Sequence, residues 1–303
     1  MLGASVVSAI RELAWDNKFK ILTPSSQQLD LTSENETAKY FGIHKPEVVV
    51  HLAAKVMGLR GNMDNQIQSM RQNSRINESL FLAATKYPPK QIFFAGTVAS
   101  YAFPYQSLPL REEYFLGGDV HAGEFGYAWA KRSAYPWLRL LSEELGVSWT
   151  YALFTNLFGP NDRFIGPHTH VIPALIHKAF ESKRSKSSKS LDVWGHPEVT
   201  RDFLYAPEAA RASLIAIENS SQKGLIVNIA SGVETSMKNV AESVAAHFEI
   251  ENVSWDSAQP IGVPNRSMNI DKLLSFGFQP KTDLHEQLGK TIEWYLTNPS
   301  LVR

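Results

Sequence analysis

The sequence predicts an α/β protein with a doubly wound parallel (Rossmann) sheet and a smaller mixed α/β lobe. Two observations support this fold class. Short apolar segments typical of buried strands, at residues 47–52, 91–95 and 148–154, alternate with longer helical segments and short loops. In addition, small or polar residues follow directly after these strands, at the edge of a parallel sheet where ligands bind.

The first half of the chain supplies most of this sheet. Ser33 and Glu36 form a capping box at the start of a helix that Pro46 ends. Pro136 lies inside the helix that carries Tyr127, so we expect that helix to kink, or to end and restart. In order, we expect a helix at 1–10, a strand at 19–22, a loop at 28–31, the capped helix, a turn at 53–56 and a helix from about 64 to 86.

The second half is less regular and contains Pro160, Pro167 and Pro173. We assign residues 1–160 to the Rossmann domain, with strands around 203–230 returning to it. Residues 161–303 then form mainly the second lobe. The expected elements are helices at 171–180, 207–218, 239–247 and 284–296, and strands at 191–194, 203–205 and 225–229.

The composition excludes several classes of function. Thirty basic residues balance thirty acidic ones, which gives no broad electrostatic case for nucleic acid or acidic membranes. The absence of cysteine excludes disulfides, thiolate nucleophiles and cysteine metal sites, and we predict no metal. No apolar run approaches the roughly 20 residues of a membrane span, so a cytoplasmic protein is the default. The basic segment from Lys183 to Lys189 is interpreted as a solvated loop, with phosphate contact as the alternative.

Tyr127 and Lys131 are the residues around which the functional hypothesis is built. Four residues apart on a helix, their side chains lie one turn apart on the same face. An ammonium group in that position can lower the pKa of the phenol and hold a ribose hydroxyl beside it. Such a phenol can give or take a proton while a hydride moves to or from a neighbouring carbon. The pattern also occurs by chance in many helices, so the neighbouring motifs decide its meaning.

Several neighbouring motifs resemble one family. Together with Tyr127 and Lys131, the segments Leu52-Ala-Ala-Lys-Val56 and Gly96-Thr-Val-Ala-Ser-Tyr101 resemble the extended short-chain dehydrogenase/reductases. Later motifs resemble GDP-L-fucose synthase, and the resemblance covers nearly the whole chain. These motifs are Thr155-Asn-Leu-Phe-Gly-Pro-Asn-Asp162, His170-Val-Ile-Pro-Ala-Leu175, and Val193-Trp-Gly195 with Arg201-Asp-Phe203.

The resemblance implies an NADP-dependent nucleotide-sugar epimerase/reductase. That family converts a GDP-4-keto-6-deoxy sugar to GDP-L-fucose by C3/C5 epimerisation and NADPH reduction at C4. It implies NADP binding by residues 1–160, substrate binding mainly by 161–303, and a homodimer formed through the helices near 64–86 and 127–145. The segment 23–26, which lacks an acidic residue, also favours NADP(H) over NAD.

Catalytic roles can be carried over from the family residue by residue. Tyr127 is expected to give a proton to the C4 oxygen, and Lys131 to hold the nicotinamide ribose. The family's active-site serine falls on Thr97 in an ungapped alignment, whereas a gap would make Ser100 the nearest hydroxyl. His170 matches an epimerisation acid/base, because imidazole exchanges protons near neutral pH. A histidine that caps the following helix is the alternative.

The resemblance also assigns binding residues. Cations suit a diphosphate and a tryptophan offers a flat apolar face, so these types fit a nucleotide-sugar site. The expected substrate-binding residues are Lys178, Trp194, Arg201 and Arg266. The expected cofactor-binding residues are Gly3, Ser26, Asp30, Leu31, Ala53, Ala54, Gly96, Lys131, Thr155, Asn156, Leu157 and His170.

The sequence departs from the family pattern in three places. The second epimerisation acid/base of the family, a cysteine, falls on Ala99, or on Tyr101 in the gapped alignment. Ile261 stands where the family often has an aspartate, which puts the guanosine end in question. The phosphate-binding turn begins only at its third glycine, Gly3, and we therefore expect an incomplete chain that lacks the first strand of the sheet.

Two alternatives to the full epimerase/reductase stay open. The first is a 4-ketosugar reductase that acts on a different nucleotide-sugar with weak, altered or absent epimerase activity, which Ala99 and Ile261 favour. The second is a non-catalytic dinucleotide-binding protein, which the missing cysteine and the incomplete phosphate-binding turn favour. Tyr127, Lys131 and His170 argue against the second alternative, because a sensor needs no proton donor.

Overall fold

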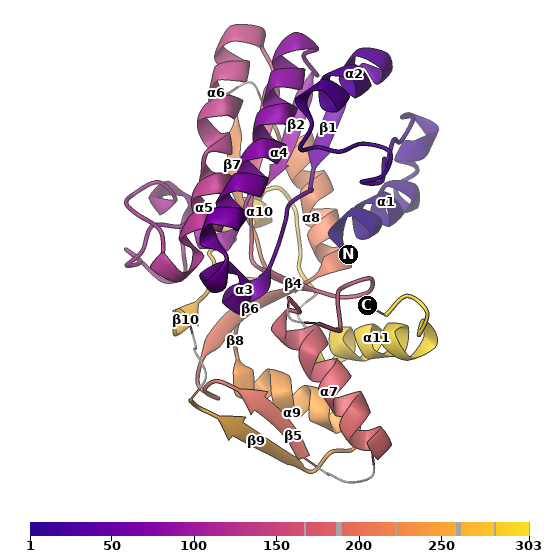
Figure 1. Cartoon of the computed structure of the whole chain (residues 1–303), viewed down its shortest axis with the longest axis vertical. Helices are drawn as coiled ribbons and strands as arrows, with labels where there is room; N and C mark the ends of the chain where they lie inside the picture. The colour runs from indigo at the N-terminus through magenta and orange to yellow at the C-terminus, as the bar shows by residue number, and fades with distance from the viewer. Residues whose placement is uncertain (167, 186–189, 222, 259–261, 282, 303) are drawn as a thin grey trace.

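The structure is a computed structural model that describes residues 1–166, 168–185, 190–221, 223–258, 262–281 and 283–302. Its centre is a four-stranded parallel sheet in the order β1-β2-β3-β7. Figure 1 shows β1 and β2 towards one side of this sheet and β7 at the other side. Phe94, Tyr151 and Ile226 lie side by side in register across three of these strands. The strands are β1 (Val48–His51), β2 (Gln91–Ala95), β3 (Ser148–Phe154) and β7 (Leu225–Ile229). The predicted doubly wound parallel sheet is confirmed.

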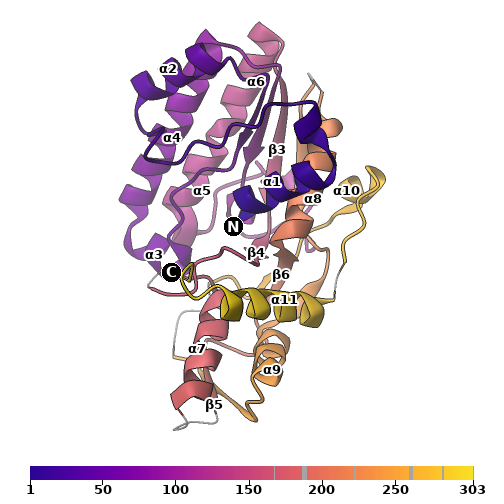
Figure 2. The ribbon, with the colours of Figure 1, turned by 90° about the vertical axis from the view of Figure 1, so that its right-hand side faces the viewer.

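Helices cover both faces of this sheet, as the predicted alternation of strands and helices requires (Figure 2). One face carries α2 (Glu34–His44), α4 (Gln66–Lys86), α5 (Phe125–Arg132) and α6 (Ala134–Leu145). The other carries α1 (Leu2–Glu12), α8 (Ala206–Glu218) and α10 (Asp271–Ser275). Aromatic side chains, among them Phe81, Phe93 and Phe94, are fully buried between sheet and helices.

The predicted break in the Tyr127 helix is confirmed. Helix α5 ends at Arg132 and α6 begins at Ala134. Pro136 is the third residue of α6, where a backbone N–H has no intrahelical acceptor, so its missing donor costs no hydrogen bond there. The proline therefore allows a new helix to start directly after the one that carries Tyr127 and Lys131.

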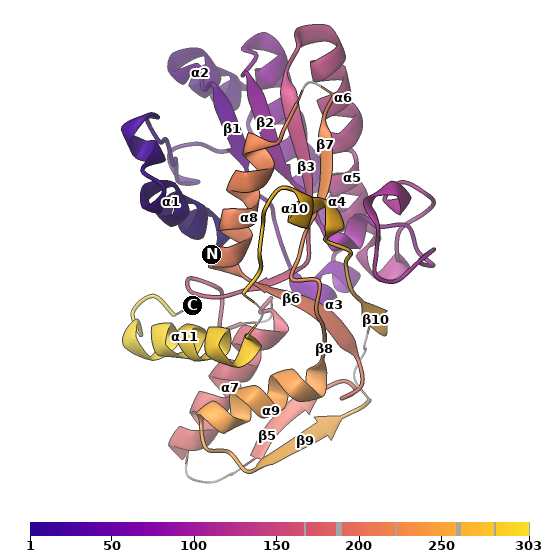
Figure 3. The ribbon, with the colours of Figure 1, turned by 180° about the vertical axis from the view of Figure 1, so that it is seen from behind.

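The second lobe has its own hydrophobic core, which includes Phe158, Phe164 and Ile176. Strand β6 crosses the molecule between α8 and α9 (Figure 3). The lobe's strands are β4 (Asn156–Phe158), β5 (Ser190–Trp194), β6 (Thr200–Tyr205), β8 (Glu234–Ser236), β9 (Asn252–Asp256) and β10 (Asn265–Arg266). Its helices are α7 (Val171–Ser185), α9 (Met237–His247) and α11 (Leu284–Thr297). Strand β6 pairs in parallel with β4 and β10 and antiparallel with β8, whereas β5 pairs in parallel with β9.

Short helices interrupt several of the segments that connect the longer elements. Helix α3 (Gly58–Asp64) precedes α4, so the long helix begins at Gln66. The 3-10 helices are η1 (Trp15–Asn17), η2 (Val98–Ser100), η3 (Glu112–Tyr114) and η4 (Ala122–Glu124). The other predicted helices, and every predicted strand but one, are confirmed with ends shifted by at most five residues.

The predicted strand at 19–22 is wrong. Residues 20–25 have no regular structure, and the side chains of Phe19 and Ile21 are exposed. β1 is an edge strand, and among the described residues no strand pairs with its outer edge. A strand needs a neighbour to satisfy its backbone hydrogen bonds, and this segment has none.

The capping box at α2 is half formed. Ser33 Oγ accepts a hydrogen bond from the Glu36 backbone N–H at 3.3 Å, as predicted. The Glu36 carboxylate accepts from the Asp30 N–H at 3.2 Å instead of returning to Ser33.

Across the residues that the structure describes, no helix is both long and apolar enough to span a bilayer.

Candidate active site

The side chain of Lys131, on helix α5, reaches the carboxyl end of β2. The residue is 2% exposed, and Nζ donates a 2.8 Å hydrogen bond to the carbonyl oxygen of Ala95. The same nitrogen lies 4.8 Å from the centroid of the Phe94 ring. Burial lowers the pKa of Lys131 to about 7. The amine can therefore act as a hydrogen-bond donor and a partial charge at the sheet edge where ligands bind.

Tyr127 lies one turn before Lys131 and is partly buried. Burial raises the pKa of the Tyr127 phenol above its ordinary value, and the nearby Glu124 carboxylate raises this pKa further. The expected lowering of this pKa by Lys131 is therefore wrong in this structure. The Lys131 amine bonds to a backbone carbonyl and is itself close to half-neutral at pH 7.

Thr97 and Ser100 differ clearly in their surroundings. Thr97 follows β2, is partly exposed, and its Oγ1 accepts a 3.3 Å hydrogen bond from the Ala99 N–H. Ser100 is fully buried, and its hydroxyl donates to the Ala128 carbonyl at 3.4 Å. Thr97 thus has the more accessible hydroxyl, as the ungapped alignment requires of an active-site residue.

Ala99 lies against the helix that carries Tyr127. It is 4% exposed and forms a small apolar cluster with Val120 and Ala128, against which the Tyr127 ring packs. A methyl group thus stands beside the phenol at the position that the ungapped alignment assigns to the thiol, and the gapped alternative, Tyr101, stays open. The methyl group can neither donate nor accept a proton.

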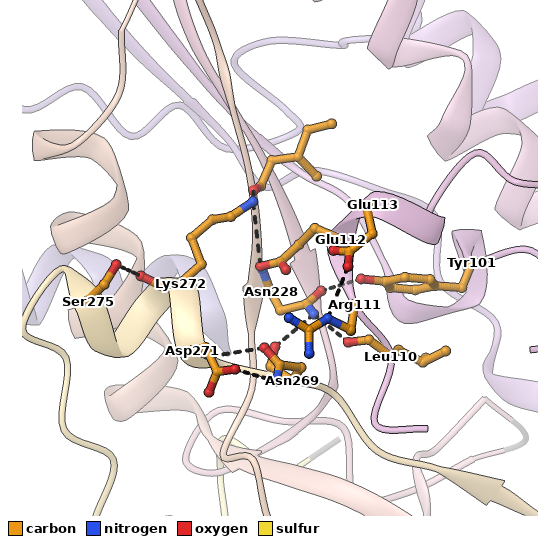
Figure 4. Close-up of polar contacts among 11 residues, drawn as sticks. Tyr101, Leu110, Arg111, Glu112, Glu113, Asn228, Asn269, Asp271, Lys272 and Ser275 are labelled. Carbon is orange, nitrogen blue, oxygen red and sulfur yellow. Dashed lines mark hydrogen bonds and ion pairs between the residues drawn. The ribbon is translucent and has the colours of Figure 1, made fainter. Parts of the chain in front are cut away.

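A buried polar network holds the segment that follows η2 (Figure 4). Asn228, the residue before the last of β7, accepts a 2.7 Å hydrogen bond from the Tyr101 hydroxyl. Its amide nitrogen donates to the carbonyls of Leu110 and Asn269, both at 2.9 Å, and its backbone N–H donates to Glu112 at 3.0 Å. Because all of these groups are buried or partly buried, the network fixes the loop beside Thr97. The sequence analysis missed it, although an asparagine inside an apolar strand was a visible signal.

His170 lies directly before α7, close to a buried carboxylate. Its Nδ1 is 3.8 Å from Asp162 Oδ2, a buried oxygen that makes no hydrogen bond with the described residues. The His170 side chain is 43% exposed. The exposed part of the imidazole can therefore be reached by a ligand, and the Asp162 carboxylate on its other side can orient the ring. His168, which received no predicted role, bonds through Nδ1 to the Met57 carbonyl at 3.1 Å.

Two of the predicted substrate-binding residues are in contact. Lys178 Nζ, on α7, lies 4.5 Å from the centroid of the Trp194 ring at the end of β5, and it donates to the Asp192 carbonyl at 3.0 Å. Burial lowers the pKa of Lys178. Trp194 is 59% exposed. The pair presents a cation and a flat aromatic surface together on the second lobe.

The other two predicted substrate-binding residues are neighbours across a strand pair. Arg201 on β6 is the register partner of Arg266 on β10. Arg266 is buried and makes an ion pair with Glu124 at 2.6 Å, and its Nε donates to the Tyr105 hydroxyl at 2.7 Å. Burial lowers the pKa of Arg201 to about 10, and the Arg266 charge contributes to this lowering. The structure thus gives Arg266 internal partners that the sequence analysis missed.

Apart from Lys131 and His170, the predicted cofactor-binding residues fall into two groups along the sheet edge. Gly3, Ser26, Asp30 and Leu31 lie in or near the first turn of α1 and in the segment before α2. Apart from the chain neighbours of Gly3 and the backbone of its own helix, no described atom lies within 4 Å of the place a Cβ would occupy there. Ala53, Ala54, Gly96, Thr155, Asn156 and Leu157 follow the carboxyl ends of β1, β2 and β3.

Hydrogen bonds fix two of the segments in the second group. The Asn73 side chain accepts from the Lys55 N–H at 2.9 Å and donates to the Lys55 carbonyl at 3.1 Å, which holds the segment after β1. The Thr155 hydroxyl and the Asn156 amide both donate to the Asp202 carbonyl, at 2.8 and 3.2 Å. The sheet edge is therefore a set of ordered segments rather than loose loops.

Asp202 is a buried carboxylate that the sequence analysis did not assign, although it stands next to Arg201. Its oxygens accept hydrogen bonds from the Ser231 N–H and hydroxyl at 2.9 and 2.8 Å and from the Gly232 N–H at 2.9 Å. Burial raises the pKa of Asp202 to about 6. These bonds tie β6 to the turn that follows β7.

Two sequence interpretations fall partly outside the described residues. Lys183 belongs to the last turn of α7, and its Nζ forms a 2.7 Å ion pair with Glu249. The interpretation of this part as a loop is therefore wrong, since α7 continues to Ser185. Residues 186–189 of the basic segment lie outside the described residues, as does Ile261.

Comparisons with known proteins identify relatives over almost the whole chain. Residues 3–230 match the NAD dependent epimerase/dehydratase family. The chain is 31% identical to a GDP-L-fucose synthase from Sinorhizobium fredii over 299 residues, which is 98% of this chain and 93% of the relative.

Two solved structures have the same fold. One is a GDP-L-fucose synthetase from Naegleria fowleri bound to NADP, with a TM-score of 0.88, 24% identity, and coverage of 100% of this chain and 91% of that one. The other is a GDP-6-OMe-4-keto-L-xylo-heptose reductase from C. jejuni, with a TM-score of 0.88, 22% identity, and coverage of 98% and 95%.

Proposed function

The chain belongs to the NAD dependent epimerase/dehydratase family, and we propose that it is an NADP-dependent GDP-sugar epimerase/reductase of the GDP-L-fucose synthase type. One observation carries this proposal. The Lys131 amine lies at the carboxyl end of β2, one helical turn from Tyr127, and Thr97 follows the same strand. The similarity to the Sinorhizobium fredii enzyme supports a GDP-linked 4-keto sugar as the substrate.

The residues at the sheet edge fit a nicotinamide dinucleotide. Lys131 and Thr97 supply an amine and a hydroxyl there. His51 Nε2, at the end of β1, is buried without a hydrogen bond among the described residues. Burial, with a smaller contribution from the Lys131 charge, lowers the pKa of His51 to about 3. The open first turn of α1 at Gly3 offers backbone N–H groups to a phosphate. When bound, NADPH supplies the hydride for reduction at C4.

In this proposal Tyr127 acts as an acid. Its raised pKa keeps the phenol protonated at neutral pH, so it can give its proton to the C4 oxygen as that oxygen gains negative charge. The Thr97 hydroxyl can donate a hydrogen bond to the same oxygen, and Lys131 can hold a ribose hydroxyl of the cofactor. The raised pKa also makes the phenol a weaker acid, so its proton moves only as hydride transfer turns the C4 oxygen into a basic alkoxide.

Epimerisation needs additional proton transfers next to the carbonyl. His170, oriented by Asp162, is the proposed acid/base for one of them. Ala99 cannot supply the second, and losing a positioned acid/base typically costs about 10²–10⁴-fold in the affected step. A second candidate function, a 4-ketosugar reductase without full C3/C5 epimerase activity, is therefore favoured by the buried methyl group at position 99.

The rest of the nucleotide-sugar is assigned to the second lobe. Lys178 and Trp194, which are in contact, are proposed to bind one part of the substrate, and Arg201 to bind the diphosphate.

Apolar side chains such as Ile67 on α4, Phe125 on α5 and Leu140 on α6 are exposed, which supports the proposal of a homodimer through these helices. Sedimentation analysis tests the dimer. A cytoplasmic location stays a prediction.

The ketosugar reaction tests the proposed function directly. Purified protein is mixed with NADPH and a panel of GDP- and UDP-linked 4-keto-6-deoxy sugars, and NADPH oxidation is followed. We expect oxidation with a GDP-linked substrate. In deuterated water without NADPH, full exchange at both C3 and C5 identifies an epimerase/reductase, and exchange at one or neither carbon identifies the reductase. A lack of oxidation with every sugar would contradict both.

A further inference from the structure

Tyr151 is a buried tyrosine that contacts two segments of the proposed active site. It lies on β3, inside the sheet between β2 and β7, as the register partner of Phe94. The residue is 0% exposed. Its hydroxyl donates a 2.9 Å hydrogen bond to the backbone carbonyl of Lys131. The Tyr151 side chain thus links the centre of the sheet to the helix that carries Tyr127 and Lys131.

The ring of Tyr151 fills the space beside Gly96, the residue directly before Thr97. A Cβ at position 96 would overlap Cε1 of this ring, and it would lie 2.9 Å from Cζ and 3.0 Å from the Ala152 carbonyl oxygen. The backbone of Gly96 is held close to β3, because its N–H donates to the same Ala152 carbonyl at 2.7 Å. Position 96 therefore has no room for a side chain while the Tyr151 ring is in place.

The surroundings of the Tyr151 ring keep it where it is. The Phe94 ring stacks on it with centroids 5.5 Å apart, and the centroid of the Phe115 ring lies 4.9 Å away. The hydroxyl is fixed to the Lys131 carbonyl. In a close-packed interior, a ring held in this way cannot turn aside to admit an extra methyl group without moving its neighbours.

The two contacts of Tyr151 define how the active-site segments lie relative to each other. The hydroxyl fixes the backbone of α5 at Lys131, and the Lys131 amine in turn bonds to the Ala95 carbonyl at 2.8 Å. The ring fixes the end of β2 at Gly96, from which Thr97 follows as the first residue of the next turn. The Lys131 amine and the Thr97 hydroxyl thus come from two segments that meet the same buried phenol.

We propose that Tyr151 is a positioning residue of the active site, which fixes Lys131 relative to Thr97, and that Gly96 lacks a side chain because the Tyr151 ring occupies that space. The inference rests on the proposed function, in which Lys131 and Thr97 act on the cofactor and on the C4 oxygen. It differs from the family resemblance in the reason for the glycine. The resemblance assigns Gly96 to cofactor binding, where a glycine allows a ligand to approach the backbone closely.

A double-mutant cycle in thermal unfolding without ligand tests the ring contact. We expect Gly96→Ala to lower the melting temperature by about 5–10 °C in wild type, but by less than about 2 °C when Tyr151→Leu is already present. If Tyr151→Leu does not fold, Tyr151→Met removes the same ring and takes its place. Equal losses in the two backgrounds would overturn the assignment of Gly96 to the ring.

Gly42→Ala is the matched control for the cycle. Gly42 lies on α2 against the ring of Tyr87, with 3.0 Å between the place of its Cβ and the Tyr87 hydroxyl oxygen. Tyr87 is only partly buried, so the end of its side chain can move, and alanine favours the helix more than glycine does. We expect no fall in the melting temperature for this variant.

Tyr151→Phe tests the hydroxyl contact, because it keeps the ring and removes the bond to Lys131. We expect kcat for NADPH-dependent ketosugar reduction to fall by about tenfold, with the KM for the sugar within about threefold of wild type. Tyr295→Phe is the matched control, since it removes a 2.8 Å hydrogen bond between a buried tyrosine and His177 in the second lobe. It should lose similar stability and keep the wild-type kcat. A wild-type kcat in Tyr151→Phe, or equal losses of kcat in both variants, would overturn the positioning role.

Fluorescence titration with NADPH separates the two reasons for the glycine. In the Tyr151→Leu background, Gly96→Ala should change the NADPH dissociation constant by less than about threefold. Weakening by more than about tenfold in that background would show that the cofactor requires the glycine, and would overturn its assignment to Tyr151. If wild type neither binds NADPH nor reduces any ketosugar, the proposed function fails and the positioning role falls with it, whereas the melting-temperature cycle still decides whether the ring excludes a side chain at position 96.

Discussion

Lys131 donates a 2.8 Å hydrogen bond from Nζ to the carbonyl oxygen of Ala95, the last residue of β2. This bond ties the helix that carries Tyr127 to the sheet edge. It also explains why the amine does not make the phenol more acidic, because its donor is directed to the backbone and burial lowers the pKa of Lys131 to about 7. The Tyr127 phenol is therefore protonated at neutral pH before the reaction, as the proton donor in a carbonyl reduction must be.

Replacing the buried amine should stabilise the fold in a pH-dependent way. The pKa of Lys131 is about 7 in the folded state and near 10.5 in the unfolded state, so the unfolded state binds more protons between these values. The cost of burying this group is therefore fully present below pH 7 and disappears as the pH rises towards 10.5. We expect Lys131→Met to be more stable than wild type by about 1–3 kcal/mol near pH 6.5, even after the loss of one hydrogen bond.

Urea unfolding at several pH values measures this effect, and the advantage of Lys131→Met should shrink as the pH approaches about 9.5. The same variant should lose about 10²-fold or more in reductase activity. A stability difference that stays constant across this pH range would show that the amine is not buried as a partly neutral group.

Restoring a thiol beside Tyr127 should restore proton exchange. Ala99 packs against Val120 and Ala128 with the Tyr127 ring alongside, so the Ala99→Cys side chain would point into the proposed site. We expect Ala99→Cys to accelerate deuterium exchange at the second sugar carbon by about 10²-fold or more. Ala99→Ser, of similar size and much lower acidity, is the control. Equal exchange in both variants would mean that position 99 does not take part in epimerisation.

His170 and Asp162 should act together in exchange and not in reduction. The His170 ring nitrogen lies 3.8 Å from an Asp162 oxygen that has no hydrogen-bond partner among the described residues. We expect His170→Gln to slow deuterium exchange by about 10²-fold or more and Asp162→Asn to slow it by about tenfold, with smaller losses in NADPH oxidation. Equal losses in exchange and oxidation would instead point to a binding role for His170.

The Asn228 network should be a major source of stability for the loop beside Thr97. Asn228→Leu removes the partners of the Tyr101 hydroxyl and of the Leu110 and Asn269 carbonyls. We expect a loss of about 3–5 kcal/mol in the free energy of unfolding, against about 1–2 kcal/mol for Tyr101→Phe. A double-mutant cycle in urea should give losses that do not add, because both variants break the same hydrogen bond. Additive losses would contradict the network.

Periodicity alone predicted most of the fold. The strands at 91–95, 148–154 and 225–229 are correct because their apolar residues are buried on both faces of a parallel sheet. The error at 19–22 has a physical cause, since a strand depends on a neighbour that a local pattern cannot reveal. The break at Pro136 was predictable because it depends only on the covalent geometry of proline.

The site was predicted less completely than the fold. Tyr127, Lys131 and Thr97 were identified from local motifs and the family resemblance, and the structure places them at one end of the sheet. The contact between Glu124 and Arg266 joins residues 142 positions apart, so no local pattern indicates it. The sign of the pKa change of Tyr127 also depends on burial and on Glu124, which only the folded chain defines.

Isotope transfer to the sugar tests the central claim most directly. The protein is mixed with NADPH deuterated at the transferred position and a GDP-linked 4-keto-6-deoxy sugar, and the product is analysed by mass spectrometry and NMR. We predict one deuterium at C4 of the sugar with wild type, and a rate lower by about 10²–10⁴-fold with Tyr127→Phe, whose thermal stability should match wild type. Deuterium at C4 at the wild-type rate in Tyr127→Phe would contradict the account.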